Sequence, residues 1–272
     1  MIKIFFSIIG VCIAFLIGVL FFLYITAPSH YTVLVIGSDQ RGDERARSDV
    51  MFVVSIPKSG DKQPVFLSVP RDTKVEDKEH GLQKMTHFYA MGDRTDPNKK
   101  LGNRTLTQEK VEDLLDIKVD GTLEVTFDSF QEIIDSVDGV SLEGKNTTGS
   151  QALARIRDRF TEGRSDFDRQ ANEREVFRGI LTKIKSPTKA RALYDYFQTS
   201  DKANLEINKV KLARFAFGAG IARGGDVSIG EMKELEVPGK GEKIYTPSFG
   251  KALYYWVVDE PELKKIVDEN LK

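Results

Sequence analysis

Cysteine, histidine and tryptophan are scarce in this chain of 272 residues, which holds 1 Cys, 3 His and 1 Trp. The single cysteine, Cys12, stands inside a long apolar run, so the remainder of the chain has no thiol to oxidise and forms no disulfide. His30, His80 and His87 lack the spacing of metal ligands, and there is no HExxH sequence. These absences argue against a disulfide scaffold and against a zinc site of the helical type.

The sequence also lacks two catalytic motifs, the GxSxG elbow and the P-loop, and has no large net charge. The absence of a GxSxG elbow and of a P-loop argues against a serine-triad hydrolase and a P-loop kinase. Lysine and arginine together number 40 against 41 acids, for a formal net charge of −1. Because no overall positive field would draw the protein to nucleic acid, we expect no nucleic-acid partner.

A long apolar run occupies the N-terminus. No charged residue lies between Lys3 and His30, a stretch of about 25 residues where about 20 suffice to span a bilayer core. The apolar part of a signal peptide is usually about 7–15 residues long. Phe22 and Tyr24 stand near the outer end, where aromatic residues gather at a membrane interface. Residues 1–28 are therefore predicted to be an uncleaved single-pass anchor, with a cleaved signal peptide as the alternative.

The orientation follows from the positive charge at the start of the chain. Lys3 and the amino terminus precede the span, which places the following domain outside the cytoplasmic membrane. Only Ala27-Pro-Ser separates the span from the first predicted strand. We therefore expect the active surface to lie close to the lipid headgroups.

Three short, β-branched runs read as buried strands of an α/β sheet, at Tyr31–Ile36, Met51–Ile56 and Val65–Val69. Charged residues stand beside each of these strands. Loops at strand ends are where open α/β sheets collect ligand groups. Carboxylates and arginines brought together there suit a phosphate ester held with a divalent cation.

Asp39 and Asp49 flank the loop between the first two strands. Two such acids could hold one Mg²⁺ or Mn²⁺, with water and substrate phosphate completing the octahedron. The alternative is that both acids are solvated or pair with arginine. Arg47 and Arg71 each lie near one end of a strand, where the guanidinium fork suits phosphate oxygens. Here the alternative is an Arg–Asp ion pair that locks the turn.

The middle of the chain alternates helices and strands. Thr107 is the expected N-cap of a helix that buries Val111 and Leu115, and Ile117–Phe127 alternates as a strand. Near the C-terminus, residues 254–256 (Tyr-Tyr-Trp) are predicted to be the last core strand rather than a stacking site.

Arginine is concentrated between residues 155 and 174, mostly in two predicted helices separated by a break near Thr161–Ser165. Many arginines with few lysines favour fixed phosphate contacts. A charged helical face that pairs with the neighbouring acids is the alternative.

Several of these segments, taken together, resemble the LytR–CpsA–Psr family of Gram-positive cell-envelope proteins. The resemblance covers Tyr31 to about Leu181 and rests on segments in a fixed order: IGSDQR, RSDVM, LSVPRD, KMTHFYAMG, FDSFQEIIDSVDGV, GSQALARIRDR and SDFDRQ. It implies an α/β fold, a mostly β central sheet flanked by helices (an α/β/α sandwich) after one transmembrane helix. The domain would be extracytoplasmic and occupy residues 31–260, followed by a C-terminal tail over residues 261–272.

The resemblance also implies an activity. The family transfers a glycopolymer, such as teichoic acid or capsular polysaccharide, from a polyprenyl pyrophosphate carrier to peptidoglycan. A phosphodiester forms and polyprenyl phosphate leaves. The expected partners are therefore the lipid-linked glycopolymer, peptidoglycan and membrane lipid, at the cell membrane.

The same resemblance assigns roles to residues. Asp39 and Asp49 would hold Mg²⁺, and Arg71 and Asp166 are the expected catalytic residues, with Asp166 as a base for the attacking hydroxyl. The pyrophosphate would contact five cationic residues: Arg47, Lys84, Arg157, Arg159 and Arg169.

The chain departs from the family pattern at Asn172 and Glu173, where the family usually has arginine and glutamine. An acid near a phosphate would repel it unless it pairs with an arginine. Two alternatives to the transferase therefore stay open: a polyprenyl pyrophosphate phosphatase and a non-catalytic protein that binds the lipid carrier or the envelope.

Overall fold

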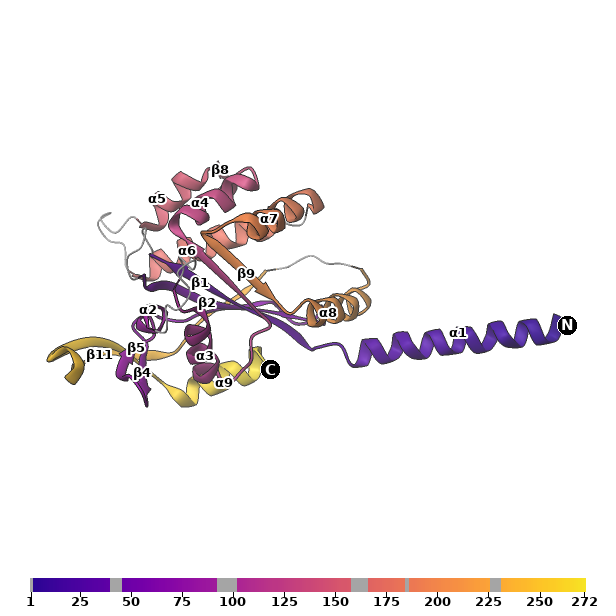
Figure 1. The fold of residues 1–272 in the computed structure, drawn as a ribbon, viewed down its shortest axis with the longest axis horizontal. Coiled ribbons are helices and arrows are strands. Elements are labelled where there is room, and N and C mark those ends of the chain that lie inside the picture. The colour runs from indigo at the N-terminus through magenta and orange to yellow at the C-terminus, as the bar shows by residue number, and fades with distance from the viewer. Residues whose placement is uncertain (1, 40–45, 92–101, 158–165, 184–185, 226–230) are drawn as a thin grey trace.

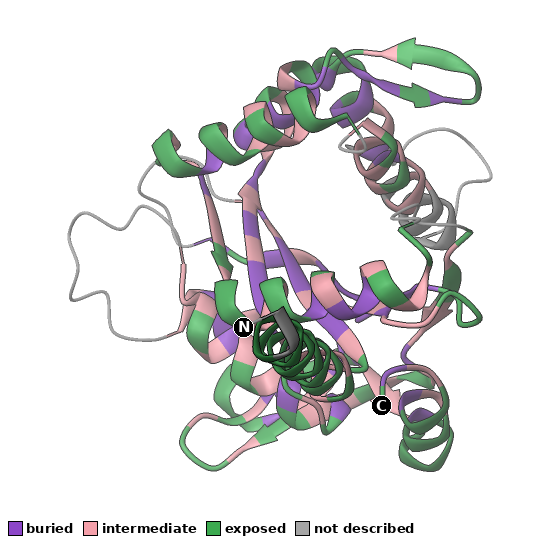
Figure 2. Ribbon diagram, turned by 90° about the vertical axis from the view of Figure 1, so that its right-hand side faces the viewer, coloured by how far each residue is buried: buried purple, intermediate pink, exposed green. Residues whose placement is uncertain are grey.

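A long helix projects from one end of the α/β domain in a computed structural model, which describes residues 2–39, 46–91, 102–157, 166–183, 186–225 and 231–272 (Figure 1). This helix, α1 (Ile2–Ile25), has 24 residues and would be about 36 Å long at 1.5 Å per residue. Its segment Ile4–Ile25 is long and apolar enough to cross a membrane. Figure 2 shows it in front of the domain, exposed along its length.

A six-stranded mixed sheet forms the centre of the domain, in the order β10-β3-β2-β1-β6-β9. Strand β1 runs parallel to β6 and antiparallel to β2, while β3 runs parallel to β10. The three strands expected from β-branched runs are all present. The strands are β1 (His30–Ser38), β2 (Ser48–Pro57), β3 (Val65–Ser68), β6 (Gly121–Thr126), β9 (Ala203–Ile207) and β10 (Lys233–Glu236).

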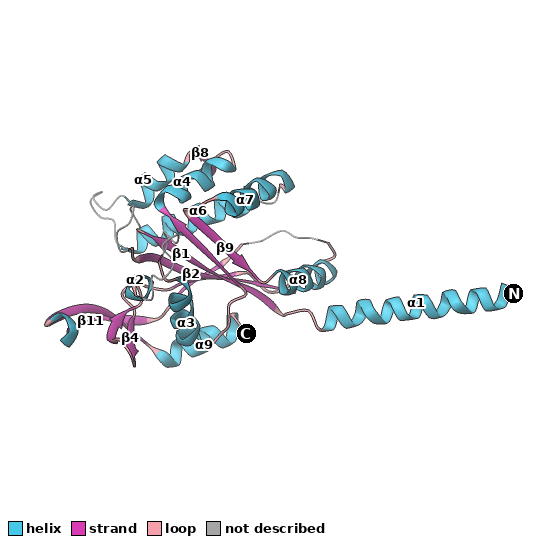
Figure 3. Cartoon of the chain, in the orientation of Figure 1, coloured by secondary structure: helices cyan, strands magenta, loops and turns pink. Residues whose placement is uncertain are grey.

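Helices cover both faces of this sheet, which confirms the predicted α/β/α sandwich (Figure 3). One face carries α2 (His87–Ala90), α3 (Arg104–Leu115) and α9 (Glu260–Asn270). The other carries α4 (Phe127–Ser136), α6 (Asp166–Lys183), α7 (Pro187–Thr199) and α8 (Lys209–Ala222). Helix α5 (Gly149–Arg157) packs on α4 and α6.

Successive side chains of β1 point to opposite faces of the sheet, so this strand contributes to the hydrophobic core on both sides. Leu34 and Ile36 point to the α3 side and belong to the largest buried cluster, with Phe88 of α2. Val33 and Val35 point to the other side. There, Phe177 of α6 lies 5.0 Å from the ring of Phe52 and 6.1 Å from that of Phe66.

Three two-stranded sheets complete the fold. They are β4 (Lys74–Asp77) with β5 (Gly81–Lys84), β7 (Val140–Leu142) with β8 (Lys145–Thr147), and β11 (Gly239–Thr246) with β12 (Lys251–Val258), the last pair joined by the short helix η1 (Pro247–Phe249).

Two expectations about these elements were wrong, and the one for the Tyr-Tyr-Trp segment was confirmed only in part. Helix α3 begins a turn earlier than expected, with Asn103 as its N-cap accepting a 3.0 Å hydrogen bond from Leu106 N, while Thr107 is buried inside the helix. The Tyr-Tyr-Trp segment lies in β12, outside the central sheet, although Tyr255 is fully buried. Residues 261–272 are mostly helix α9 rather than a tail, because Leu263 and Val267 pack into the largest core.

A mostly shielded carboxylate fixes β4 to α3. Asp77 accepts hydrogen bonds from Lys110 Nζ at 2.6 Å and from the backbone N–H of His80 at 2.9 Å, and lies 2.8 Å from His80 Nδ1. The Lys110 contact, followed by the contact with His80, holds the pKa of Asp77 well below its usual value. The charged form of this carboxyl group is therefore part of the folded state.

Asp77→Asn should destabilise the domain at pH 7 by about 1.5–3 kcal/mol, the usual contribution of hydrogen bonds to a charged group. Because the folded-state pKa is lowered, the contribution is complete well above the ordinary pKa of 3.8 and decreases progressively as the pH falls below 3.8 toward the folded-state value. Urea denaturation of both proteins between pH 7 and pH 3 measures this difference. A difference that stays constant at low pH would contradict the assignment.

Candidate active site

Charged side chains gather at one edge of the central sheet. Since β1 and β3 run in the same direction and β2 runs against them, β1 and β3 end where β2 begins. This edge receives Asp39 after β1, Arg47 and Asp49 at the start of β2, and Arg71 after β3. The structure thus brings together four of the residues selected from the sequence.

The Asp39 carboxylate is held by the loop that it begins. Asp39 Oδ1 accepts a 2.6 Å hydrogen bond from the backbone N–H of Arg47, and Asp39 N donates to Arg47 O at 3.1 Å. The register of β1 against β2 shifts after Gly37, so that Ser38 faces Ser48. This bulge changes the direction of the strand ends, so that Asp39 and Asp49 lie at the same edge of the sheet.

Alternating charges continue from β2 to β5. Arg71 Nη1 lies 2.9 Å from Asp49 Oδ1, and Arg71 Nε lies 3.9 Å from Asp72 Oδ2. Asp72 Oδ1 in turn accepts a 2.6 Å hydrogen bond from Lys84 Nζ. The side chain of Arg71 is 33% exposed and that of Asp49 17% exposed, so the cations are neutralised in place yet reachable from solvent.

Backbone hydrogen bonds hold this series of ion-paired residues in position. Thr73 N donates to Pro70 O at 3.0 Å and closes a turn around Arg71. Thr86 N then donates to Arg71 O at 3.0 Å, and Met85 N donates to Thr73 O at 2.9 Å. Since Met85 is fully buried, the turn is tied to the core.

His87 is a neighbour of this site that the sequence reasoning missed. Its Nδ1 lies 2.9 Å from Gln83 Oε1, and its ring lies 5.7 Å from that of Phe249. Burial lowers the pKa of His87, and the charges of Arg47 and Lys84 lower it further, whereas Asp72 raises it. Burial and the two cations therefore favour the neutral form of this imidazole. The only signal in the sequence was its place in the KMTHFYAMG segment.

His87 should titrate below the ordinary value of 6.5, and Arg47→Gln should raise its pKa because a nearby positive charge is removed. Histidine NMR of the full chain in detergent measures both values. His87→Gln assigns the resonance, and Arg191→Gln, an exposed change on α7, is the matched control. An identical titration in Arg47→Gln and the wild type would show that Arg47 does not act on this imidazole.

Two arginines of the arginine-rich segment serve the fold instead of a ligand. Arg155 of α5 binds Glu143 at 2.7 Å and Glu175 at 3.2 Å, and its Nε donates to Asn172 Oδ1 at 3.1 Å. Asn172, one of the departures from the family pattern, thus joins α6 to α5. Arg174 Nε lies 2.9 Å from Glu234 Oε2 of β10. For these two arginines the ion-pair interpretation holds.

Four further predictions fall largely outside the described part of the chain. Arg159 lies outside the described residues. Arg157 ends α5, Asp166 begins α6, and Arg169 lies in the first turn of α6, but the side chains of these three are not described. Figure 1 places the end of α5 and the start of α6 at the side of the molecule where β1 ends.

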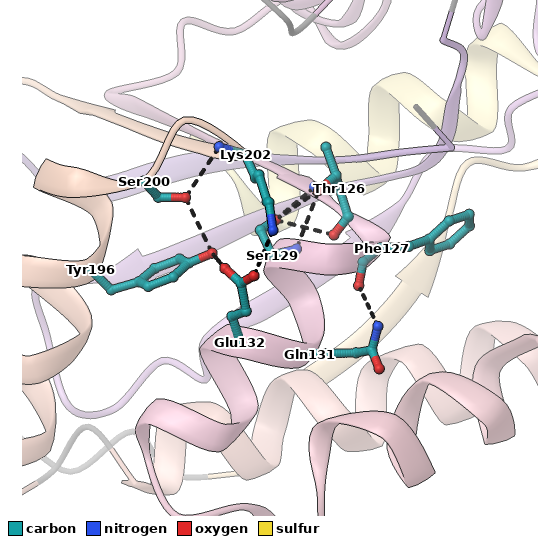
Figure 4. Close-up of polar contacts among 8 residues, drawn as sticks. All are labelled: Thr126, Phe127, Ser129, Gln131, Glu132, Tyr196, Ser200 and Lys202. Atoms are coloured by element: carbon teal, nitrogen blue, oxygen red, sulfur yellow. Dashed lines mark hydrogen bonds and ion pairs between the residues drawn. The ribbon is translucent and has the colours of Figure 1, made fainter. Parts of the chain in front are cut away.

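Helix α4 starts at the same edge, directly after β6, where Thr126 pairs with Ser38 of β1. Its first turn is closed by its own side chains: Thr126 Oγ1 accepts from Ser129 N at 3.2 Å, and Ser129 Oγ accepts from Thr126 N at 2.8 Å (Figure 4). Glu132 binds Lys202 Nζ at 2.7 Å and accepts from the Tyr196 hydroxyl at 2.8 Å. These contacts fix α4 against α7 and β9.

A buried hydrogen-bonded pair, Tyr89 and Glu124, lies next to the strand ends that carry the candidate site. The Tyr89 hydroxyl donates a 2.5 Å hydrogen bond to Glu124 Oε1, and both residues are almost completely buried. Burial, and then the charge of Glu124, raises the pKa of Tyr89 well above its usual value. Because Glu124 faces Ile36 across β1 and β6, this pair anchors α2 beneath the candidate site.

Comparison with known proteins identifies the family of this chain. The model of the LytR_cpsA_psr family matches residues 24–148 and 142–272, which together cover most of the chain. The chain belongs to the LytR–CpsA–Psr family. The match extends the resemblance seen in the sequence to the C-terminal helix α9.

Curated members of the LytR–CpsA–Psr family resemble the chain over most of its length. The polyisoprenyl-teichoic acid–peptidoglycan teichoic acid transferase TagU of Halalkalibacterium halodurans is 27% identical over 267 residues, which cover 90% of this chain and 79% of that protein. TagU of Bacillus subtilis is 28% identical over 259 residues, covering 88% of this chain and 76% of TagU. Family membership and these names confirm the prediction of an enzyme of the transferase class.

Solved structures share the fold. A protein from Listeria innocua superposes with a TM-score of 0.68 at 24% identity, covering 89% of this chain and 97% of the other. B. subtilis TagU gives a TM-score of 0.61 at 26% identity over 89% and 95% of the two chains. TagT, solved bound to LI-WTA, gives 0.63 at 25% identity, with 89% of each chain covered.

The family resemblance implies Mg²⁺, and the chemistry of the donors present fits it. Magnesium in phosphate-transferring sites is usually bound by one or two carboxylates plus substrate phosphates. Asp39 and Asp49 supply two carboxylates at one rim, beside cations that suit the phosphates. Among the described residues, no group of three or more His, Cys, Asp or Glu side chains could hold a metal ion.

Proposed function

We propose that this protein transfers a glycopolymer from a polyprenyl pyrophosphate carrier to peptidoglycan. The observation that carries the proposal is the series of ion pairs Asp49–Arg71–Asp72–Lys84 at the end of the central sheet. The protein that contains it belongs to a transferase family. Arg71 and Lys84 are preorganised donors for pyrophosphate oxygens. Asp49 and Asp72 already hold the two cations in place. A phosphate that binds would accept hydrogen bonds from these same cations without first having to orient them.

The reaction requires one bond to form and one to break. A peptidoglycan hydroxyl oxygen attacks the phosphorus that carries the polymer, and the bridging P–O bond to polyprenyl phosphate breaks. A phosphodiester forms, and the hydroxyl proton passes to a base, for which Asp166 is our proposal from the family pattern. Arg47, Arg71 and Lys84 neutralise the charge that develops on the phosphate oxygens. Mg²⁺ held by Asp39 and Asp49 would supply further charge neutralisation there.

Arg157, Arg159 and Arg169 are proposed as the second half of the phosphate clamp. The end of α5 and the start of α6 lie at the same side of the molecule as the end of β1 (Figure 1). Asn172 accepts a hydrogen bond from Arg155, so the clamp proposed here is built without a cation at position 172.

The site faces away from the anchor, contrary to the expectation from the short linker. Strand β1 follows α1 after a few residues and has 9 residues, which at about 3.3 Å each put Asp39 about 30 Å from the end of β1 that is joined to α1. The carrier tail would therefore need an apolar path along the domain. The sheet face toward α6 and α8 offers paired apolar residues along β1 and β2: Tyr31 with Ile56, Val33 with Val54, and Val35 with Phe52.

The test uses the full-length protein in proteoliposomes with lipid-linked glycopolymer, peptidoglycan oligomers and Mg²⁺. Wild type is expected to attach polymer to peptidoglycan and to release polyprenyl phosphate in equal amount. Asp39→Asn should lower the rate and raise the Mg²⁺ concentration needed for half of the maximal rate. Arg191→Ala, an exposed change on α7, is the control for protein handling.

The outcomes separate the remaining alternatives. Pyrophosphate cleavage without attached polymer would favour a phosphatase, and tight retention of the carrier without turnover would favour a binding protein. An unchanged Mg²⁺ dependence in Asp39→Asn would reject the proposed metal ligand. A reporter after Lys272 that is active only in the cytoplasm would reject the extracytoplasmic location.

A further inference from the structure

Helix α8 presents an apolar stripe to solvent on the face opposite its core contacts. Leu212, Phe215 and Ala219 form the inner face and pack on Tyr31 of β1. The outer stripe has helical spacing and consists of the exposed residues Val210, Ala213 and Ile221 and the partly exposed Phe217. Val210 is 72% exposed and Ile221 is 51% exposed. An exposed apolar stripe of this kind marks an interaction surface.

The same helix is fastened to the point where α1 enters the domain. A guanidinium nitrogen of Arg214 donates to Thr26 O. Gly218 lies so close to the linker that a Cβ there would stand 2.5 Å from the Cβ of Ala27. Lys58 Nζ donates to Tyr24 O at 3.3 Å and lies 4.8 Å from the centre of the Tyr24 ring. Helix α8 is thereby held beside the last turn of α1 (Figure 1).

Cationic residues border the stripe. Lys209 is exposed at the start of α8, and Arg214 lies on the exposed face beside Val210. Arg223, just past the end of α8, donates to the Lys58 carbonyl at 3.3 Å and keeps Lys58 at the same end of the domain. Apolar residues flanked by lysine and arginine are typical of helices that lie in the membrane interface.

We propose that α8 is an interfacial helix that docks the domain on the membrane surface. Its apolar stripe would enter the boundary between headgroups and acyl chains, and its cations would contact anionic phosphates. The occupant is a lipid surface rather than a protein, because α1 brings the bilayer to this position: Tyr24 and Ala27, at the outer end of the span, are the residues that α8 and Lys58 hold. The inference rests on the proposed membrane location of α1.

The test measures the depth of single spin labels in the full chain, with one protein per nanodisc of phosphatidylcholine and phosphatidylglycerol. Oxygen concentrates in the bilayer and a polar nickel chelate stays in water, so the ratio of their collisions with the label reports depth. A label on the native Cys12 reports on α1. In a Cys12→Ser background, Val210→Cys reports on α8, and Tyr245→Cys, which is 64% exposed on β11 at the opposite end, is the matched control.

The expected result is preferential collision with oxygen at residues 12 and 210 and with the nickel chelate at residue 245. A label at 12 that meets the chelate would reject the anchor itself. A lipid-embedded label at 12 with a water-exposed label at 210 would reject only the docking of α8. A label at 210 that neither reagent reaches would mean that protein covers the stripe, which also overturns the proposal.

A second arm tests the cations and the stripe. In nanodiscs of phosphatidylcholine alone, the label at 210 should shift toward the chelate, and Lys209→Gln should cause the same shift in the anionic discs. Ile221→Asp should expose the label in both lipids while leaving the label at 12 embedded. An unchanged depth at 210 in all of these conditions would contradict the proposed contact with anionic headgroups.

Discussion

Arg71→Ala should lower the rate of polymer transfer by about 10²- to 10³-fold, the effect typical of removing one preorganised donor from a charged transition state. Arg71 is tied to Asp49 at 2.9 Å, and its backbone carbonyl is fixed by Thr86 N, so its guanidinium is presented in one orientation. The substitution removes this donor and also leaves the half-buried Asp49 carboxylate without it. The rate of polymer attachment in proteoliposomes is the measurement.

Arg71→Lys separates geometry from charge. A lysine keeps one positive charge but cannot bind a phosphate and Asp49 through a planar fork, so we expect most of the loss to remain. Arg191→Lys, on an exposed i,i+4 pair with Asp195, is the matched control and should transfer at the wild-type rate. Equal rates for wild type and Arg71→Ala would remove Arg71 from the site.

Deleting residues 261–272 should abolish folding of the domain. The deletion removes three side chains that are almost completely buried in the largest core: Leu263, Val267 and Leu271. Removing a buried aliphatic side chain costs about 2–5 kcal/mol, so three such losses amount to about 6–15 kcal/mol. That range equals the whole stability of an ordinary domain, about 5–15 kcal/mol. Far-UV circular dichroism and resistance to limited proteolysis measure the outcome.

Two milder variants keep this prediction testable when the truncated protein does not accumulate. Leu263→Ala should fold but lose about 2–5 kcal/mol in urea denaturation. Deleting only Lys272, which is exposed and pairs with Asp116 at 2.8 Å and Asp268 at 3.1 Å, should change little. A truncated protein with a wild-type unfolding midpoint would show that α9 is dispensable.

The central strands could be predicted because short β-branched runs leave few alternatives to a buried sheet. Elements that depend on distant contacts could not be. Most residues of α9 are charged, which obscures the spacing of four residues between Leu263, Val267 and Leu271. These three side chains form a buried face only because α3 and the sheet lie opposite them. For β12, the aromatic content indicated burial but could not show that its partner is β11 rather than the central sheet.

The candidate site was predictable in part for a related reason. Acids and arginines next to strand ends must meet at one edge once the strand directions are known, which is why Asp39, Asp49 and Arg71 could be grouped. Which arginine pairs with an acid depends on three-dimensional neighbours. Arg155 and Arg174 look like phosphate ligands in the sequence, yet Glu143 and Glu234 lie within ion-pair distance of them. His87 was missed because its environment comes from four separate segments.

Strand β1 also has a mechanical consequence. The anchor joins it at one end and the candidate site lies at the other, so a pull between the membrane and a polymer bound at the site acts along the strand. β1 is paired with β2 on one side and with β6 on the other. The ladder hydrogen bonds lie across the direction of such a pull. They are therefore loaded together in shear instead of opening one after another, and we expect the domain to withstand a pull applied between its two ends.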